Sequence, residues 1–336
     1  MSVATNQFSV LQKQLDAELH TLSSESKRRN SQIKSASDKS IKILKTVHSA
    51  NDLLRHPDFV VPFTLASSSR NAKLTSIAIQ CLQGLSSSEC IPQARLAEVL
   101  DGFMESTHLA MEIQLKVLQV VPIFFKTYAK YITGDLCAKL LQCCANLLQT
   151  PHKSSIVAGT ASATLQQLIN EIFDRLSYTW DATSPVEDGA PSQTTLQDDF
   201  EVLISNSETA KVNTYRHDAN KLFAALFSAL ETKTSNSQQN KEEKSYLNVS
   251  ELPMDYGLEI LESILTNNWE AFVKFEDLQF ILKIKAIPLL LRSVSSSKHF
   301  AIVVRSCRCI RLLLRTEYLS VCLLYTSDAA DELDGV

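Results

Sequence analysis

The sequence predicts an all-α protein built as an armadillo- or HEAT-like α-solenoid of stacked helices. Glycine is scarce, with 7 residues in 336, whereas turn-rich β architectures and phosphate-binding loops need more of it. Apolar residues recur at helical spacing along most of the chain. No segment shows the alternation of apolar and polar residues that is typical of half-buried strands, so we expect no sheet.

The segment 109–128 has the most strongly apolar helical pattern. Its charged and amide residues fall on one narrow stripe, which consists of Glu112, Lys116, Gln119 and Lys126. Because the other positions are mostly large and apolar, neighbouring helices should cover this helix on most sides. Pro122 lacks an N–H group and clashes with the preceding turn, which predicts a kink or a break there.

Helices are also expected on the amino-terminal side of this segment. The first apolar stripe consists of Phe8, Leu11, Leu15, Leu19 and Leu22. A second helix should follow Asn30, and Pro57 can occupy the first position of another, where a missing N–H costs nothing. Asn71 is a suitable cap for the helix after it. The next helix should begin after Pro92, just before the central segment.

Beyond the central segment, Gly134 separates it from helices expected at 136–148 and 156–176. Residues 181–200 are acidic and contain Pro and Gly but no Lys or Arg, which indicates a linker. A helix is expected around 222–230, followed by a polar tract at 232–244. After Pro253, apolar periodicity predicts helices at 258–265, 278–282, 287–294 and 300–318.

Composition limits the classes of function. A net charge of −4 gives no general attraction to nucleic acid. The amino terminus lacks the apolar core of a signal peptide, and no run of 18 apolar residues exists, so neither secretion nor a membrane span is expected. The cysteines fall mostly within apolar helical patterns, which predicts buried thiols in a reducing compartment.

The sequence offers no recognisable catalytic, cofactor-binding or metal-binding constellation. Cys307 and Cys309, and the adjacent pair Cys143 and Cys144, lack the second pair that a zinc site needs. The histidines are scattered singly, and no glycine-rich phosphate loop is present. We therefore expect no enzyme activity, no cofactor and no metal.

Two basic faces are the candidate sites for contact with a protein partner or anionic lipid. The first lies near the amino end and contains Lys27, Arg28, Arg29 and Lys34. The second follows one face of the last predicted helix and contains Arg305, Arg308, Arg311 and Arg315. Ordinary solvated helix faces are the alternative interpretation, and the pattern by itself does not decide between the two.

Several short segments match a known pattern in order and spacing. They are LDAEL at 15–19, LSSESKRR at 22–29, VVPF at 60–63, ASATLQQ at 161–167, FDRL at 173–176 and GLEILESIL at 257–265. This pattern resembles the amino-terminal region of the Mon-two (also Ysl-two) family of Golgi and endosome trafficking scaffolds. These proteins are relatives of the large guanine-nucleotide exchange factors that activate Arf GTPases.

The resemblance implies a domain organisation. Residues 5–180 would form a dimerisation and cyclophilin-binding-like helical domain, and 181–200 an acidic linker. Residues 201–320 would form the start of the domain upstream of the exchange-factor module. Residues 322–336 depart from the family pattern and are expected to be a non-native tail.

The resemblance also implies a function. The chain would be a non-catalytic scaffold in vesicle-mediated protein transport, peripheral on Golgi, trans-Golgi network and endosome membranes. It would act through self-association, other scaffold subunits and Arf-like small GTPases, without nucleic acid. A generic armadillo-type adaptor or transport receptor that binds peptides is the alternative, although the regular groove of Asn and Trp residues expected of one is not evident.

Overall fold

The computed structural model describes residues 3–26, 30–149, 154–179, 200–231, 246–249 and 252–315. Helices dominate this part of the chain, which confirms the all-α class. The chain divides into two compact units, Met1–Leu165 (unit 1) and Gln166–Val336 (unit 2), and the division falls inside one helix. The expected tail, 322–336, and residues 181–199 of the expected linker lie outside the described residues.

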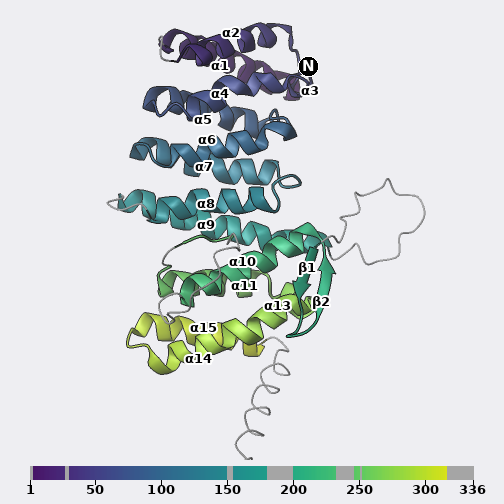
Figure 1. The fold of residues 1–336 in the computed structure, drawn as a ribbon, viewed down its shortest axis with the longest axis vertical. Coiled ribbons are helices and arrows are strands. Elements are labelled where there is room, and N and C mark those ends of the chain that lie inside the picture. The colour runs from purple at the N-terminus through teal and green to yellow at the C-terminus, as the bar shows by residue number, and fades with distance from the viewer. Residues whose placement is uncertain are drawn as a thin grey trace, which may run out of the picture. The chain divides into compact units, whose positions relative to one another are not determined.

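Unit 1 is a stack of helix pairs, as the solenoid prediction requires (Figure 1). Helices pack within a pair, as α1 against α2 and α4 against α5, and between neighbouring pairs, as α2 against α4 and α5 against α7. Its elements are α1 (Val3–Glu25), α2 (Ser31–Thr46), α3 (Ala50–Leu54), η2 (Pro57–Val60), α4 (Val61–Ser67), α5 (Ala72–Ser87), η3 (Gln93–Arg95), α6 (Leu96–Ser106), α7 (Met111–Thr127), α8 (Asp135–Gln149) and the first part of α9 (Ser155–Asp174).

Local signals in the sequence set several of these boundaries. Pro57 is the first residue of η2. The Asn71 side chain accepts hydrogen bonds from the backbone N–H groups of Lys73 and Leu74, at 3.1 and 3.3 Å, and so caps α5. Gly134 adopts a φ of 56° just before α8, a left-handed conformation that favours glycine. The predicted signals at Pro57, Asn71 and Gly134 are therefore confirmed.

The central helix α7 is largely buried, as predicted. Phe124 is fully buried and meets Phe103 of α6 edge to face at 5.6 Å. The helix runs continuously through Pro122, so the break that was one of the two expected outcomes there does not occur. One residue of the polar stripe differs from expectation, because Lys116 is half-buried and its Nζ donates to Ser76 Oγ at 2.7 Å.

Unit 2 is also mainly helical, and its core is aromatic. Phe223 of α10 packs against Phe173 of α9 and Phe272 of α12, with ring centroids 5.9 and 5.1 Å away. Its other elements are η4 (Arg175–Thr179), β1 (Phe200–Leu203), β2 (Thr209–Val212), α10 (Thr214–Glu231), α11 (Met254–Asn267), α12 (Trp269–Lys274), α13 (Glu276–Ile281), the π-helical turn η6 (Leu282–Ala286), α14 (Ile287–Ser296) and α15 (Phe300–Arg315).

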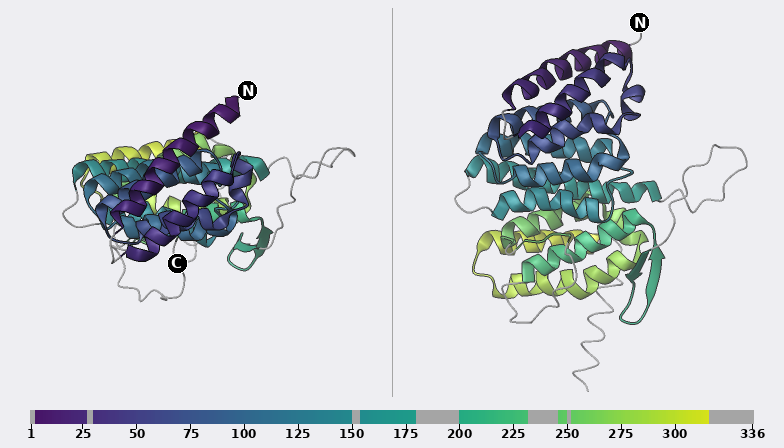
Figure 2. Two further views of the ribbon diagram at one scale, coloured as in Figure 1. Left: turned by 90° about the horizontal axis from the view of Figure 1, so that it is seen from above. Right: turned by 45° about the horizontal axis from the view of Figure 1, so that its top comes forward.

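A β-hairpin in unit 2 shows that the prediction of no sheet was wrong. Strands β1 and β2 pair antiparallel, with Phe200 opposite Val212 and Leu203 opposite Thr209. Strand β1 packs against α10 and α13, so the hairpin lies beside these helices (Figures 1 and 2). Each strand has four residues, and only Val202 and Val212 are buried. So short an alternation gives almost no periodic signal.

Candidate interaction surfaces

The amino-terminal basic face is described in part. Lys27, Arg28 and Arg29 lie outside the described residues, whereas Lys34 is exposed on α2. The same helix buries Ile33, Ser37, Ser40, Ile41 and Leu44. Its opposite side exposes three further lysines, Lys39, Lys42 and Lys45. Within the described part of the chain none of the four lysines forms an ion pair. The helix carries one acidic residue, the exposed Asp38, so α2 presents a net positive charge to solvent.

The carboxyl-terminal arginine face is partly engaged within unit 2. The guanidinium of Arg305 on α15 lies 2.9 Å from a Glu259 carboxylate oxygen and 3.4 Å from one of Glu262, both on α11. Arg308 lies 3.8 Å from Glu262 and is more exposed. These contacts join α15 to α11. Arg311 is exposed. Arg315 is the last residue of the helix, and its side chain is not among those described.

The cysteines show how helix geometry separates neighbours. Cys143 and Cys144 are both buried, as expected for core thiols, and so is Cys309. Cys307 is exposed, which corrects the expectation for that residue, because positions two apart on a helix point in different directions. No group of His, Cys, Asp or Glu among the described residues has the arrangement of a metal site.

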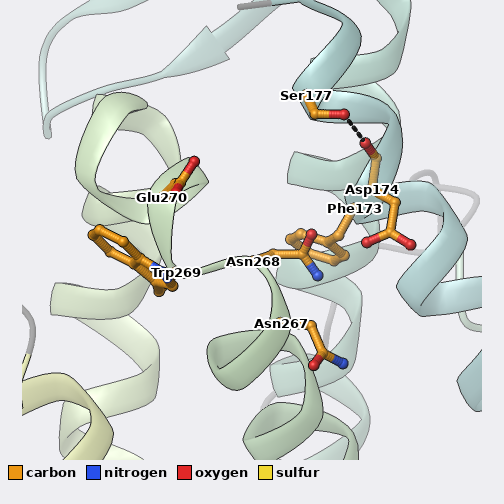
Figure 3. A pocket seen from close by; sticks show the side chains of 7 residues that line it. All are labelled: Phe173, Asp174, Ser177, Asn267, Asn268, Trp269 and Glu270. Atoms are coloured by element: carbon orange, nitrogen blue, oxygen red, sulfur yellow. Dashed lines mark hydrogen bonds between the residues drawn. The ribbon is translucent and has the colours of Figure 1, made fainter.

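A pocket in unit 2 was not anticipated from the sequence. Its volume is about 280 Å³, and it is lined by Phe173, Asp174, Ser177 and residues 267–270 (Figure 3). The first two end α9, Ser177 lies in η4, and 267–270 form the junction of α11 and α12. Trp269 is 45% exposed at this junction. In the sequence, the lining residues 267–270 read Asn-Asn-Trp-Glu between two apolar helical segments. This run matches no known binding motif, so the sequence offered no basis for predicting the pocket.

The electrostatics of this pocket are acidic. Burial raises the pKa of the Asp174 carboxyl, and hydrogen bonding by the Asn268 side chain opposes that rise. Ser177 donates its hydroxyl to the Asp174 backbone carbonyl at 2.6 Å. Asp174 and Glu270 form no ion pair with any described residue, so two carboxylates border the pocket without a compensating cation.

The described helices include none that is long and apolar enough to cross a bilayer. One basic face belongs to unit 1, and the other face and the pocket belong to unit 2.

Comparison with known proteins identifies two family modules in this order along the chain. Residues 6–180 match the dimerisation and cyclophilin-binding (DCB) domain of Mon2/Sec7/BIG1-like proteins. Residues 215–321 match the Sec7-like HUS domain of the same group. The second match begins at α10 and includes α11 to α15, whereas the hairpin precedes it.

Individual relatives agree with these matches. The chain is 59% identical over 321 residues to Protein MON2 of Saccharomyces cerevisiae, and the match covers 96% of the chain but 19% of that protein. It is 24% identical over 301 residues to the Protein MON2 homolog of Homo sapiens, and this match covers 86% of the chain and 16% of that protein. The chain thus spans less than a fifth of the length of these relatives. With both modules and this similarity established, the chain belongs to the Mon2/Sec7/BIG1-like family.

Proposed function

We propose that the chain is the amino-terminal part of a non-catalytic scaffold in vesicle-mediated protein transport between Golgi and endosomes. The main support is that a DCB match is followed by a HUS match along one helical chain. We assign the modules to 5–180 and 201–320, joined by 181–200. Helical solenoids act by presenting extended surfaces to partners, which suits a scaffold.

Self-association is the first property to test, because the matching domain is named for dimerisation. Two copies of the chain with different affinity tags are co-expressed, and one tag is used for capture. Recovery of the second copy, together with a dimer mass by light scattering at micromolar concentration, is the expected result. A monomer mass at every concentration, with no co-capture, would contradict self-association of this region.

Contact with Arf-like small GTPases and other trafficking subunits is the second part of the proposal. The chain, immobilised, is exposed to purified Arf-like GTPases loaded with a non-hydrolysable GTP analogue or with GDP. Nucleotide-dependent retention is expected, since an effector surface distinguishes the two states. In cells, a fluorescent fusion of the full-length parent protein should coincide with trans-Golgi and endosome markers; a diffuse signal would count against this location.

We further propose that α2 contributes peripheral contact with an anionic membrane, extending the basic face of Lys27, Arg28, Arg29 and Lys34. Its exposed lysines each add about 1 kcal/mol near such a surface. Reversing two of them, Lys42→Glu and Lys45→Glu, should lower partitioning onto vesicles with anionic lipid by about thirtyfold or more. Flotation with and without anionic lipid measures this.

The matched control reverses two exposed lysines outside that face, Lys126→Glu and Lys130→Glu, with the same change in net charge. Equal losses in the two double variants would show a non-specific charge effect and would remove α2 from the proposal. The second basic face is a weaker candidate, because Arg305 is already paired with two carboxylates; Arg308, Arg311 and Arg315 are its remaining members.

A further inference from the structure

Unit 1 carries opposite charges on two helices that belong to the same layer of its stack. Helix α4 packs against both α2 and α6, and the three follow one another down the stack (Figure 1). Helix α2 has four lysines and one aspartate, which give it a net charge of +3. Helix α6 has three acidic residues and no basic one, which give it a net charge of −3. Helix α4, between them, has no charged residue.

The cations of α2 are accessible to a partner. Lys39 and Lys42 are exposed on the side of the helix opposite its buried residues. The one acid of α2, Asp38, accepts a hydrogen bond from the Ser23 hydroxyl at 2.7 Å. Since no lysine of this helix forms an ion pair with a described residue, their charges can pair with carboxylates of a second molecule.

The acidic residues of α6 are exposed as well. They lie three and four positions apart, on one side of the helix, and are Glu98, Asp101 and Glu105. Arg95 lies 2.6 Å from Glu98, but it also lies 2.8 Å from Asp58. Lys139 lies 2.7 Å from Asp101, and Glu105 forms no ion pair with any described residue. Two cations thus face four carboxylates here, so α6 keeps an excess of negative charge.

The uncharged helix α4 supplies an apolar strip between the two charged helices. Every residue of α4 is buried except Val61 and Leu65, which lie about one turn apart and are half-buried. An apolar centre with a polar rim is the usual arrangement of a protein interface. A surface that is positive on one side of such a strip and negative on the other is complementary to a copy of itself turned by a two-fold rotation about the strip.

We propose that two copies of this chain associate through α2, α4 and α6, about a two-fold axis that passes near α4. The α2 lysines of each copy meet the α6 carboxylates of the other, and Val61 and Leu65 of both copies meet at the centre. This interface rests on the self-association proposed above and specifies the helices that carry it.

A second copy accounts for both charged helices, whereas an anionic membrane would attract α2 but repel α6. The α2 lysines that are covered in this dimer are the ones proposed above to contact anionic lipid. The two contacts therefore exclude each other, and the dimer is the form expected in solution.

The test is a charge swap in the 336-residue chain, with the dimer dissociation constant measured by sedimentation equilibrium at about 0.1 M salt. The first variant combines Lys39→Glu with Lys42→Glu, and the second combines Asp101→Lys with Glu105→Lys. Each variant alone places like charges opposite each other in both halves of the dimer. Its dissociation constant should therefore rise by about tenfold or more.

Mixing the two variants restores opposite charges in both halves. The acidic α2 of the first variant then meets the basic α6 of the second, and the two unaltered helices meet each other. The mixture should form a heterodimer with a dissociation constant close to that of the unmodified chain, and one chain with all four substitutions should again form a homodimer. A variant that merely failed to fold would not recover in this way.

Two control variants reverse exposed charges outside the three helices. Lys126→Glu with Lys130→Glu matches the first variant, Glu89→Lys with Glu112→Lys matches the second, and neither should change the dissociation constant. Undiminished association of either test variant, or weakened association without recovery in the mixture, would overturn the pairing of α2 with α6 and leave self-association to another surface. A monomer at every concentration of the unmodified chain would instead refute self-association itself, and this interface with it.

Discussion

At the scale of single residues, burial controls the chemistry of the thiols. Burial raises the pKa of Cys90 to about 11 and that of Cys144 and Cys309 to about 12. The thiolate is the reactive species, and a raised pKa lowers its fraction at any pH below that value. These side chains are also sheltered from reagents, whereas Cys307 is exposed.

This difference predicts selective labelling. In a Cys322→Ser background, a maleimide at pH 8 should modify one thiol of the native protein rapidly, and Cys307→Ser should abolish that fast phase. The buried thiols should react only after denaturant is added, or very slowly as pH rises towards 11. Peptide mass mapping identifies the modified residue. Fast labelling of Cys144 in the native protein would show that α8 is not packed as described.

A buried ion pair is the second feature at this scale. Arg216 on α10 donates from Nε to Asp277 Oδ1 on α13 at 2.7 Å, and Asn220 Nδ2 donates to the other oxygen at 3.0 Å. The Asp277 side chain is fully buried, and the Arg216 guanidinium lies 4.6 Å from the centroid of the Phe275 ring. Charges in such surroundings are tolerated only when they are paired.

Removing the cation should therefore be costly. Arg216→Met leaves the Asp277 carboxylate buried without its partner and should lower the free energy of unfolding by about 3–5 kcal/mol. Arg292→Met is the control, because Arg292 pairs with Glu231 at 3.1 Å on a more exposed surface, and its loss should cost under about 1 kcal/mol. Urea denaturation measures both. Equal losses would mean that burial of Asp277 does not govern the effect.

At the scale of elements, two helical glycines have opposite surroundings. Gly257 lies in α11 where a Cβ atom would collide with the Leu230 side chain of α10, so glycine permits close packing of the two helices. Gly159 lies in α9 with open space around its missing Cβ. Neither glycine adopts a positive φ. The two positions therefore differ in side-chain packing and not in backbone strain.

Replacing glycine with alanine should thus lower the stability of the protein at one of these positions and raise it at the other. Gly257→Ala forces Leu230 to move and should destabilise the protein by about 1–3 kcal/mol. Gly159→Ala removes backbone freedom from the unfolded chain without a clash and should stabilise it by about 0.4–1 kcal/mol. Thermal unfolding of both variants checks this. Stabilisation by Gly257→Ala would show that α10 and α11 are further apart than the structure places them.

At the scale of the whole molecule, a stacked architecture confines the effect of a defect. Each helix pair of a solenoid contacts mainly its neighbours, so cooperativity weakens with distance along the stack. In unit 1, α7 packs against α5, whereas α2 packs against α1 and α4. A cavity in α7 should therefore loosen α5 more than α2.

Leu118→Ala tests this confinement. Leu118 is 2% exposed, and the cavity should cost about 2–5 kcal/mol. Native-state hydrogen exchange should show the largest loss of protection in α5 and α7 and a smaller loss in α2. Gln119→Ala, at the adjacent exposed position, should cost under about 0.5 kcal/mol. A uniform loss of protection across unit 1 would indicate that the stack unfolds as a single cooperative block.

The sequence alone determined the helical class and many element boundaries, because these depend on local interactions. Apolar residues three and four positions apart define a helix face wherever that helix lies. Asn71 caps the backbone two and three residues ahead, and the left-handed turn at Gly134 is equally local. The family resemblance was likewise readable from the order of short segments, and both module matches confirm it.

Only the tertiary structure decided which charges are free and where a pocket forms. Arg305 and Lys34 belong to similar basic patterns, yet Arg305 is paired because α11 places two glutamates beside it. Likewise, Asp174 and Trp269 are far apart in sequence and come together through the packing of unit 2. The short hairpin depends on α10 and α13 for its apolar contacts. Such contacts join residues that are distant along the chain, so no local periodicity encodes them.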